Sequence, residues 1–273
     1  MPKLANLTDQ KTHFAFGKNW SSYAKSLSEH QIAEAVAGLQ RLAGESLTGK
    51  RFLDVGCGSG LHSLAALRLG ASEVLALDLD PDSVATTRAV LTAQAPTQPW
   101  SVREASVFDL DPGAMGTFDV VYSWGVLHHT GDMYRALRNA ASLVAPEGEF
   151  IFALYHRTRL CWFWKTEKRW YAGASPAAQK RAQSIYLTLL RLHSPDTFDS
   201  YIAGYTSSRG MDFFHDLHDW LGGWPYESIS PDETDAFMRS LGMRRSRAFV
   251  YPGKSTGIFG SGCDEYVYVR AAS

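Results

Sequence analysis

The segment Phe52-Leu53-Asp54-Val55-Gly56-Cys57-Gly58-Ser59-Gly60 decides the fold of this 273-residue chain. It reads as a short apolar strand with one carboxylate, then glycine at every second position, and helical spacing begins at Leu61. A strand that passes through a glycine-rich turn into a helix N-terminus makes a cradle for a nucleotide. A dinucleotide fingerprint would need its third glycine at the position of Leu61. The carboxylate of Asp54 would repel a phosphate and suits a cationic ligand.

Composition narrows the class of protein. Lys and Arg total 27 and Asp and Glu total 28, so a broad phosphate-binding face and a nucleic-acid partner are not expected. The three cysteines, Cys57, Cys161 and Cys263, form no close pair, which fits a reduced compartment. The chain shows no signal-peptide pattern and no apolar run of about 20 residues. We therefore expect a cytoplasmic protein without a transmembrane segment.

Strand and helix patterns alternate from Arg51 onward, which predicts a parallel sheet with helices on both faces. A helix from Ser28 to Leu42 precedes this alternation as a cap. The breaker Ala145-Pro146-Glu147-Gly148 separates a helix ending at Val144 from a fifth strand over Glu149–Tyr155. The pattern is then irregular, aromatic and partly helical until Ser230. It ends with a helix near Pro231–Leu241 and two strands, near Arg244–Tyr251 and Asp264–Arg270, joined as an antiparallel hairpin by the short turn Gly257–Gly262.

These patterns predict a Rossmann-like, doubly wound α/β fold in a single domain over residues 1–273. Its parts are an N-terminal cap (1–50), a nucleotide-binding core (51–155), a large aromatic-rich insertion after the fifth strand (156–230), and a C-terminal helix and hairpin (231–273).

The motif D-V-G-C-G-S-G resembles the first motif of class I S-adenosylmethionine (SAM) dependent methyltransferases. Three further motifs follow in the order found in that family. The resemblance implies a seven-stranded, mostly parallel sheet whose final strand is antiparallel. It also implies that SAM is bound and S-adenosylhomocysteine released, with the loop residues Asp54, Gly56, Cys57, Gly58 and Gly60 at the cofactor.

The second and third motifs supply further cofactor residues. Asp78 ends the second strand twenty residues after Gly58, where a carboxylate accepts both ribose hydroxyls. A register two residues later would give that role to Asp80. The resemblance places Leu79 against adenine and implies that Ser106 and Val107 hold adenine through a short polar side chain and a backbone amide, with Asp109 a weaker candidate. An ordinary turn after the third strand remains the alternative for these last residues.

The fourth motif, residues 118–129, is an apolar strand that ends in polar and aromatic side chains. Ligands of open α/β folds lie at the carboxyl ends of strands, so Ser123 and Trp124 should meet the cofactor. The motif lacks the Asn/Asp-Pro-Pro-aromatic loop of enzymes that methylate base amines, and the acidic ligand of magnesium-dependent catechol enzymes. Trp20 and Tyr23 in the N-terminal segment either place a ring face near the sulfonium or attach the cap helix to the core.

Methyl transfer to a hydroxyl or an acidic carbon also needs a proton acceptor, for which neutral histidine is the usual group. His128 and His129 follow the fourth strand, Tyr155 and His156 end the fifth, and His215 and His218 lie in the insertion. Each is a candidate catalytic residue, and packing or surface exposure is the alternative for each histidine. The spacing His-Asp-x-His-Asp at residues 215–219 would also suit a divalent ion, but nothing else in the chain supports a metal and none is expected.

The insertion holds five of the 8 tryptophans, which indicates an apolar lid over the substrate or a small separate core. Basic residues accumulate between Arg157 and Arg191. Four interpretations stay open for them: a solvated helix face, a contact to a substrate anion, a nucleic-acid contact, and peripheral membrane contact through residues 157–171.

The sequence as a whole predicts SAM-dependent methyl transfer to an oxygen or carbon, less favourably a nitrogen, of a small apolar or aromatic metabolite. Residues 220–227 and 262–266 resemble bacterial methyltransferases of the ubiquinone-biosynthesis type. The alternatives are a non-methylating enzyme on the same fold, such as a cyclase, a catalytically silent SAM-binding scaffold, and an RNA methyltransferase. The oligomeric state stays open between a monomer and a homodimer.

Overall fold

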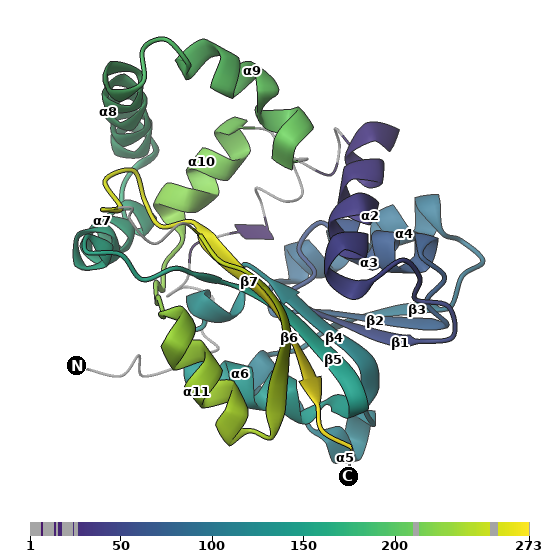
Figure 1. The fold of residues 1–273 in the computed structure, drawn as a ribbon. Coiled ribbons are helices and arrows are strands. Elements are labelled where there is room, and N and C mark those ends of the chain that lie inside the picture. Colours follow the sequence, from purple (N-terminus) through teal and green to yellow (C-terminus); the bar gives the residue numbers. More distant parts are fainter. Residues whose placement is uncertain are drawn as a thin grey trace.

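A computed structural model of the chain describes residues 7, 14, 16, 17, 24, 27–209, 213–251 and 256–272, with only the backbone at 206–209. Its centre is a seven-stranded sheet of order β3-β2-β1-β4-β5-β7-β6 (Figure 1). The strands are β1 (Arg51–Val55), β2 (Glu73–Asp78), β3 (Trp100–Glu104), β4 (Phe118–Trp124), β5 (Val144–Tyr155), β6 (Met243–Phe249) and β7 (Cys263–Arg270).

Strands β1 to β5 pair in parallel, while β7 runs antiparallel to both β5 and β6. The predicted fold class, a Rossmann-like and mostly parallel sheet with an antiparallel final hairpin, is confirmed. The connection between β6 and β7 spans residues 250–262 and is longer than the short turn expected. Because parallel strands end at one edge, the loops after β1 to β4 meet there.

Two apolar cores lie on opposite faces of the sheet. Helices α2 (Glu29–Ala43), α3 (Leu61–Arg68) and α4 (Pro81–Gln94) cover one face. Helices α6 (Met133–Ser142) and α11 (Pro231–Ser240) contribute to the core on the other face. The predicted cap helix is therefore α2, and Ser28 begins it as the N-cap of a capping box with Gln31.

The breaker before the fifth strand is an error of the sequence prediction. Strand β5 begins at Val144 and runs through Ala145–Gly148. Val144 pairs with Phe118 and Glu149 pairs with Val120, so the irregular residues lie within a register shift. Glu147, at φ 60°, takes the left-handed turn there. Proline is tolerated at such a bulge because no ladder hydrogen bond is needed from it.

The insertion is helical rather than irregular. It contains α7 (Cys161–Ala172), α8 (Pro176–His193), α9 (Phe198–Arg209) and α10 (Phe213–Gly222), green in Figure 1. Its aromatic residues form a third apolar core that includes Trp164, Tyr171 and Phe213. Ser175 caps α8 and Pro176 opens it, so a start signal was present in the sequence.

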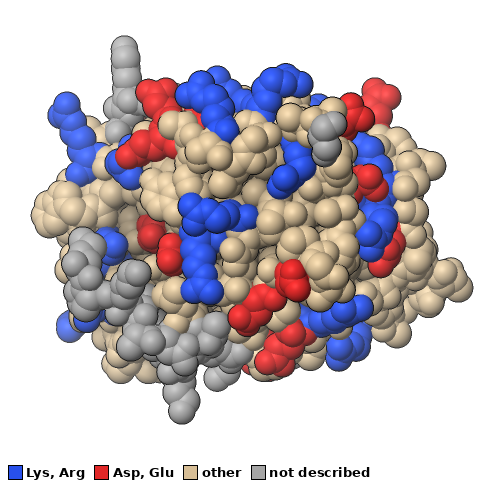
Figure 2. All heavy atoms as spheres, turned by 90° about the horizontal axis from the view of Figure 1, so that it is seen from below, with Lys and Arg blue, Asp and Glu red and all other residues tan. Residues whose placement is uncertain are grey.

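The surface carries charges of both signs. On the face seen in Figure 2, Lys and Arg are interspersed with Asp and Glu. In segment 157–171, Trp162, Phe163 and Trp170 expose large parts of their rings. Across the described ranges, none of the helices combines the length and the apolarity that a membrane crossing demands.

Candidate active site

A cavity of about 1440 Å³ follows the carboxyl edge of the sheet and continues under the insertion. One part is walled by the segments after β1, β2, β3 and β4. The other part is walled by α8, α9, α10 and the β6–β7 connection. The predicted cofactor loop and the aromatic insertion thus border one continuous space.

The glycine loop after β1 is tied to the end of β2. The amides of Gly56 and Cys57 both donate to the carbonyl of Leu77, at 2.7 and 3.0 Å. Gly56 has φ 82°, and a Cβ atom there would lie 2.5 Å from the side chain of Val126. Glycine is therefore required at this position both for the backbone angle and for space.

Asp78 joins the second motif to this loop. Its carboxylate accepts hydrogen bonds from the amides of Gly58 and Asp80, each at 2.9 Å. Burial raises the pKa of Asp78 to about 6, while these amides partly offset the rise. Asp78 lines the cavity with Gly56, Cys57 and Gly58, and its role at the ribose stays a prediction. Asp80 also lines the cavity, and it caps α4 by accepting from the amide of Asp82.

Three predicted cofactor residues do not line the cavity. Asp54 is buried beneath the loop and accepts a 2.6 Å hydrogen bond from Ser63, while burial raises its pKa to about 7. Ser123 is fully buried and donates to the carbonyl of Val55 at 2.8 Å. Gly60 is the left-handed N-cap of α3. These three residues thus support the conformation of the glycine loop and do not face the cavity.

The adenine and sulfonium ends have cavity-lining candidates. Leu79, Ser106 and Val107 line the part of the cavity after β2 and β3. The hydroxyl of Ser106 accepts from the amide of Phe108, so this side chain also caps a short helical turn. Trp124 lines the cavity after β4, and its indole N–H donates to Glu265 at 2.9 Å. Trp20 and Tyr23 lie outside the described residues.

His128, His129 and Tyr155 are brought together on the cavity wall. The rings of His128 and Tyr155 stack with centroids 3.9 Å apart, and those of His128 and His129 lie 4.4 Å apart. The amide of Tyr155 donates to Nδ1 of His128 at 3.2 Å. Burial lowers the pKa of His128 well below its ordinary value. The neutral ring must therefore carry its hydrogen on Nε2.

His129 has the opposite tautomer. Its Nδ1 lies 2.7 Å from the carbonyl oxygen of Pro225, which can only accept, so Nδ1 donates. In the neutral ring the lone pair is then on Nε2. The hydrogen bonds therefore make His128 a donor at Nε2 and give His129 the lone pair that a general base needs.

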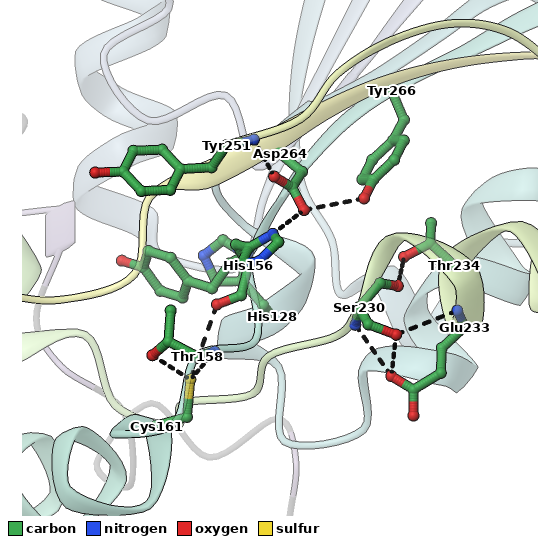
Figure 3. Close-up of polar contacts among 11 residues, drawn as sticks. His128, His156, Thr158, Cys161, Ser230, Glu233, Thr234, Tyr251, Asp264 and Tyr266 are labelled. Carbon is green, nitrogen blue, oxygen red and sulfur yellow. Dashed lines mark hydrogen bonds and ion pairs between the residues drawn. The ribbon is translucent and has the colours of Figure 1, made fainter. Parts of the chain in front are cut away.

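The other catalytic candidates do not line the cavity. His156 pairs through Nδ1 with Asp264 at 2.8 Å, and Asp264 also accepts from the amide of Tyr251 (Figure 3). His218 contacts the hydroxyl of Tyr171 at 2.8 Å, within the core of the insertion. His215 lies on α10 beside it. In the described part of the chain, no three His, Cys, Asp or Glu side chains gather as a metal site.

The sequence did not single out several lining residues. His62 opens α3 directly after the glycine loop, and burial lowers its pKa to about 4. Glu265 accepts from Trp124 and pairs with Arg41 at 2.6 Å, which links β7 to the cap helix. Trp220 lines the cavity from α10. The position of His62 directly after the glycine loop could have indicated that it lines the cavity. The roles of Glu265 and Trp220 depend on contacts between residues far apart in sequence.

Comparison with known proteins identifies relatives of the segment that contains these motifs. Residues 53–152 match the family model described as "Methyltransferase domain". The segment that matches covers the glycine loop, Asp78 and the motif that ends in His128 and His129. Residues 53–152 are a class I SAM-dependent methyltransferase domain. The predicted cofactor class is confirmed for this domain.

Among curated proteins, a ubiquinone biosynthesis O-methyltransferase of Xanthomonas campestris is 40% identical over 113 residues. That alignment covers 41% of this chain and 46% of the relative, so the chain spans about half the length of the curated relatives it matches.

Several solved structures resemble this chain in fold. The magnesium protoporphyrin IX methyltransferase of Synechocystis PCC 6803 with bound S-adenosylhomocysteine has a TM-score of 0.53 at 17% identity, over 89% of this chain and 84% of its own. The [4+2]-cyclase SpnF has a TM-score of 0.52 at 12% identity, over 87% of this chain and 81% of its own. Proteins with a similar fold thus include a methyltransferase and a [4+2]-cyclase.

Proposed function

We propose that the protein transfers the methyl group of SAM to a hydroxyl oxygen of a small, largely apolar or aromatic metabolite. One observation carries the proposal: a single cavity joins the glycine loop and Asp78 to His128, His129 and the aromatic insertion. The donor and the acceptor of a methyl group need such a shared space, because methyl transfer is an in-line displacement that positioning accelerates.

The residues present fit SAM. Gly56 and Gly58 permit close approach of the ligand to the backbone, and Asp78 offers carboxylate oxygens to ribose hydroxyls. When bound, SAM supplies an activated methyl group on a cationic sulfur. The ring of Trp124 and the carboxylate of Glu265 border the same space, and both attract positive charge.

We assign to His129 the role of the general base that accepts the proton of the acceptor hydroxyl. As the hydroxyl oxygen bonds to the methyl carbon, the carbon–sulfur electron pair stays on sulfur and the hydroxyl proton passes to Nε2 of His129. Pro225 holds the ring in the tautomer that accepts this proton. An aromatic wall, made by Tyr155 of β5 with Phe213 and Trp220 of the insertion, excludes water around the reacting atoms.

The aromatic wall supports a ring-bearing or apolar acceptor. Among the described residues that line the cavity, Arg41 is the one Lys or Arg, and its guanidinium is paired with Glu265. A polyphosphorylated acceptor is therefore disfavoured. A carbon acceptor would use the same base. The compounds that take up labelled methyl in the experiment below distinguish an oxygen acceptor from a carbon acceptor.

The test has two steps. Isothermal titration with SAM should show one binding site per chain. Incubation with methyl-labelled SAM and a panel of phenols, alcohols and enolisable ketones should then transfer label and release S-adenosylhomocysteine. Binding without label transfer would favour a cyclase or another non-methylating enzyme, while the absence of SAM binding would favour a scaffold. Label transferred to RNA and to no metabolite would reverse the choice of substrate class.

A further inference from the structure

Three buried hydrogen-bond donors lie close together where the insertion meets the sheet. They are Nε2 of His128, Nζ of Lys168 and Nε1 of Trp220, and none has a hydrogen-bond partner among the described residues. Buried donors are almost always paired in folded proteins, so three such groups in one region call for an explanation.

The aromatic ring of Tyr155 connects them. It stacks on His128 with centroids 3.9 Å apart and meets Trp220 edge-on at 5.2 Å. The ammonium of Lys168 lies 3.5 Å from the centroid of the Trp220 ring. His128, Tyr155 and Trp220 line the cavity, whereas Lys168 lies behind this wall. His128 and Trp220 thus belong to the wall at one end of the cavity, and Lys168 lies against the Trp220 ring behind that wall.

Lys168 occupies a position that normally holds an apolar residue. It points inward from α7 in the same stripe as Trp164 and Tyr171 and is fully buried. Burial lowers its pKa to about 7, while Glu167, Asp216 and Asp219 oppose that fall. Aromatic faces attract the charge but offer its N–H groups no strong acceptor. Lys168 thus differs from the other basic residues of this run, whose side chains are exposed or partly exposed.

The carbonyls and carboxylates nearby do not satisfy the two ring N–H groups. His128 already uses Nδ1 to accept from the amide of Tyr155, so its Nε2–H is the remaining donor of the ring. Trp220 has a single N–H, which can only donate. Among the described residues, both N–H groups therefore lack a hydrogen-bond acceptor at this end of the cavity.

We propose that His128, Trp220 and Lys168 form a donor subsite that binds a carbonyl-type oxygen of the methyl acceptor. His128 and Trp220 donate to that oxygen, and Lys168 acts across the Trp220 ring through its charge. The acceptor class is therefore an aromatic or apolar hydroxyl compound that also carries a carbonyl or carboxylate group. The rings of His128 and His129 are 4.4 Å apart, so the two oxygens lie close together on the acceptor. This inference rests on the proposed function.

The test uses three probes of the same shape: 4-fluorobenzoate, 4-fluorobenzamide and 4-fluorotoluene. Their binding to the full chain, saturated with S-adenosylhomocysteine, is followed by fluorine NMR titration. We expect the wild type to bind at least one of the two oxygen-bearing probes more tightly than the toluene. Trp220→Phe should weaken that preference about fivefold, the scale of one lost hydrogen bond. Lys165→Met, on the same helix but partly exposed, is the control and should keep it.

Lys168→Met separates the two sources of the oxygen. If the wild type prefers benzoate and this variant loses that preference, the subsite binds a carboxylate. If the wild type prefers benzamide and this variant keeps that preference, the subsite binds a neutral carbonyl. Equal binding of all three probes, or a Trp220→Phe protein with unchanged preference, would overturn the subsite. S-adenosylhomocysteine binding is titrated in the same samples. Its absence would count against the proposed function, whereas its presence with equal probe binding would count against the subsite alone.

Discussion

His128 and His129 are neighbours in sequence, yet the backbone gives their rings opposite roles. The amide of Tyr155 fixes the hydrogen of His128 on Nε2, and the carbonyl of Pro225 fixes that of His129 on Nδ1. A tautomer is set by the partner of the other nitrogen. The sequence pattern identified both residues, but only their partners, 27 and 96 positions away, distinguish a donor from a base.

His129→Gln should therefore lower turnover by about 10²- to 10⁴-fold, the usual contribution of a general base. SAM affinity should stay unchanged, because the residue lies on the acceptor side of the cavity. Single-turnover methyl transfer and SAM titration measure the two effects. His193→Gln, a cavity-lining histidine on α8, is the matched control. A fully active His129 variant would remove the base role from this residue.

A second prediction at the residue scale concerns the pH dependence of SAM binding. Burial raises the pKa of Asp78 to about 6, and ribose hydroxyls donate to the ionised form. SAM affinity should therefore fall as the pH drops below about 6, by at most about tenfold per unit. Free-protein stability changes in the other direction. A raised carboxyl pKa contributes stability that is present at low pH and is lost as the pH rises through about 6.

Calorimetric titrations at about pH 5 and about pH 7.5 test this linkage. Asp78→Asn should bind SAM about tenfold more weakly or worse at the higher pH and should lose the pH dependence. Asp111→Ala, which caps the distant α5 (Pro112–Met115), is the control. Identical pH profiles for the wild type and Asp78→Asn would exclude Asp78 from the ribose role.

Local sequence could predict that Asp78 lines the cavity, but not that Asp54, Ser123 and His156 lie away from it. The interval from Gly58 to Asp78 is a property of one β-α-β unit, and its length is readable in the chain. Whether a strand residue lines the cavity or lies beneath the loop depends on packing, as the bond from Ser63 to Asp54 shows. His156 is held by Asp264, 108 positions later, so no local pattern could exclude it from the site.

At the scale of elements, helix starts were the best-defined signals. Ser230 caps α11, and the side chain of Glu233 returns the bond to the backbone of Ser230 (Figure 3). Such capping interactions can be predicted from local sequence because both partners lie within one helical turn. The strand break expected at Ala145–Gly148 failed for the opposite reason, since pairing with β4 on both sides of the bulge overrides a local turn preference.

Ser230→Ala should destabilise the protein by about 1 kcal/mol, because it leaves a backbone amide of α11 without its acceptor. Urea unfolding followed by circular dichroism measures the change. Ser184→Ala, at an exposed position within α8, should alter stability by less than about 0.5 kcal/mol. Equal effects of the two substitutions would mean that the capping box contributes nothing specific.

At the scale of the whole molecule, the cavity combines two parts with different sequence signals. The strand-end part follows from motifs, so its ligand could be predicted. The insertion part is assembled by α7 to α10 and the β6–β7 connection, held by bonds such as that from Trp164 to Gly257 at 2.6 Å. Those contacts join positions 93 apart, which explains why the aromatic content alone predicted a lid or a core and not four helices.

The last prediction uses the whole chain to separate a SAM site from a dinucleotide site. A ligand at 100 times its dissociation constant stabilises the native state by about 2.7 kcal/mol. For a chain of this size, that corresponds to a rise in Tm of about 5 to 11 °C. S-adenosylhomocysteine should produce this rise and NAD should not, because the alternating glycines and Leu61 offer no pyrophosphate position. The Asp78→Asn protein should show a smaller rise with the same ligand concentration. A rise with NAD alone would mean that the glycine loop after β1 binds a dinucleotide.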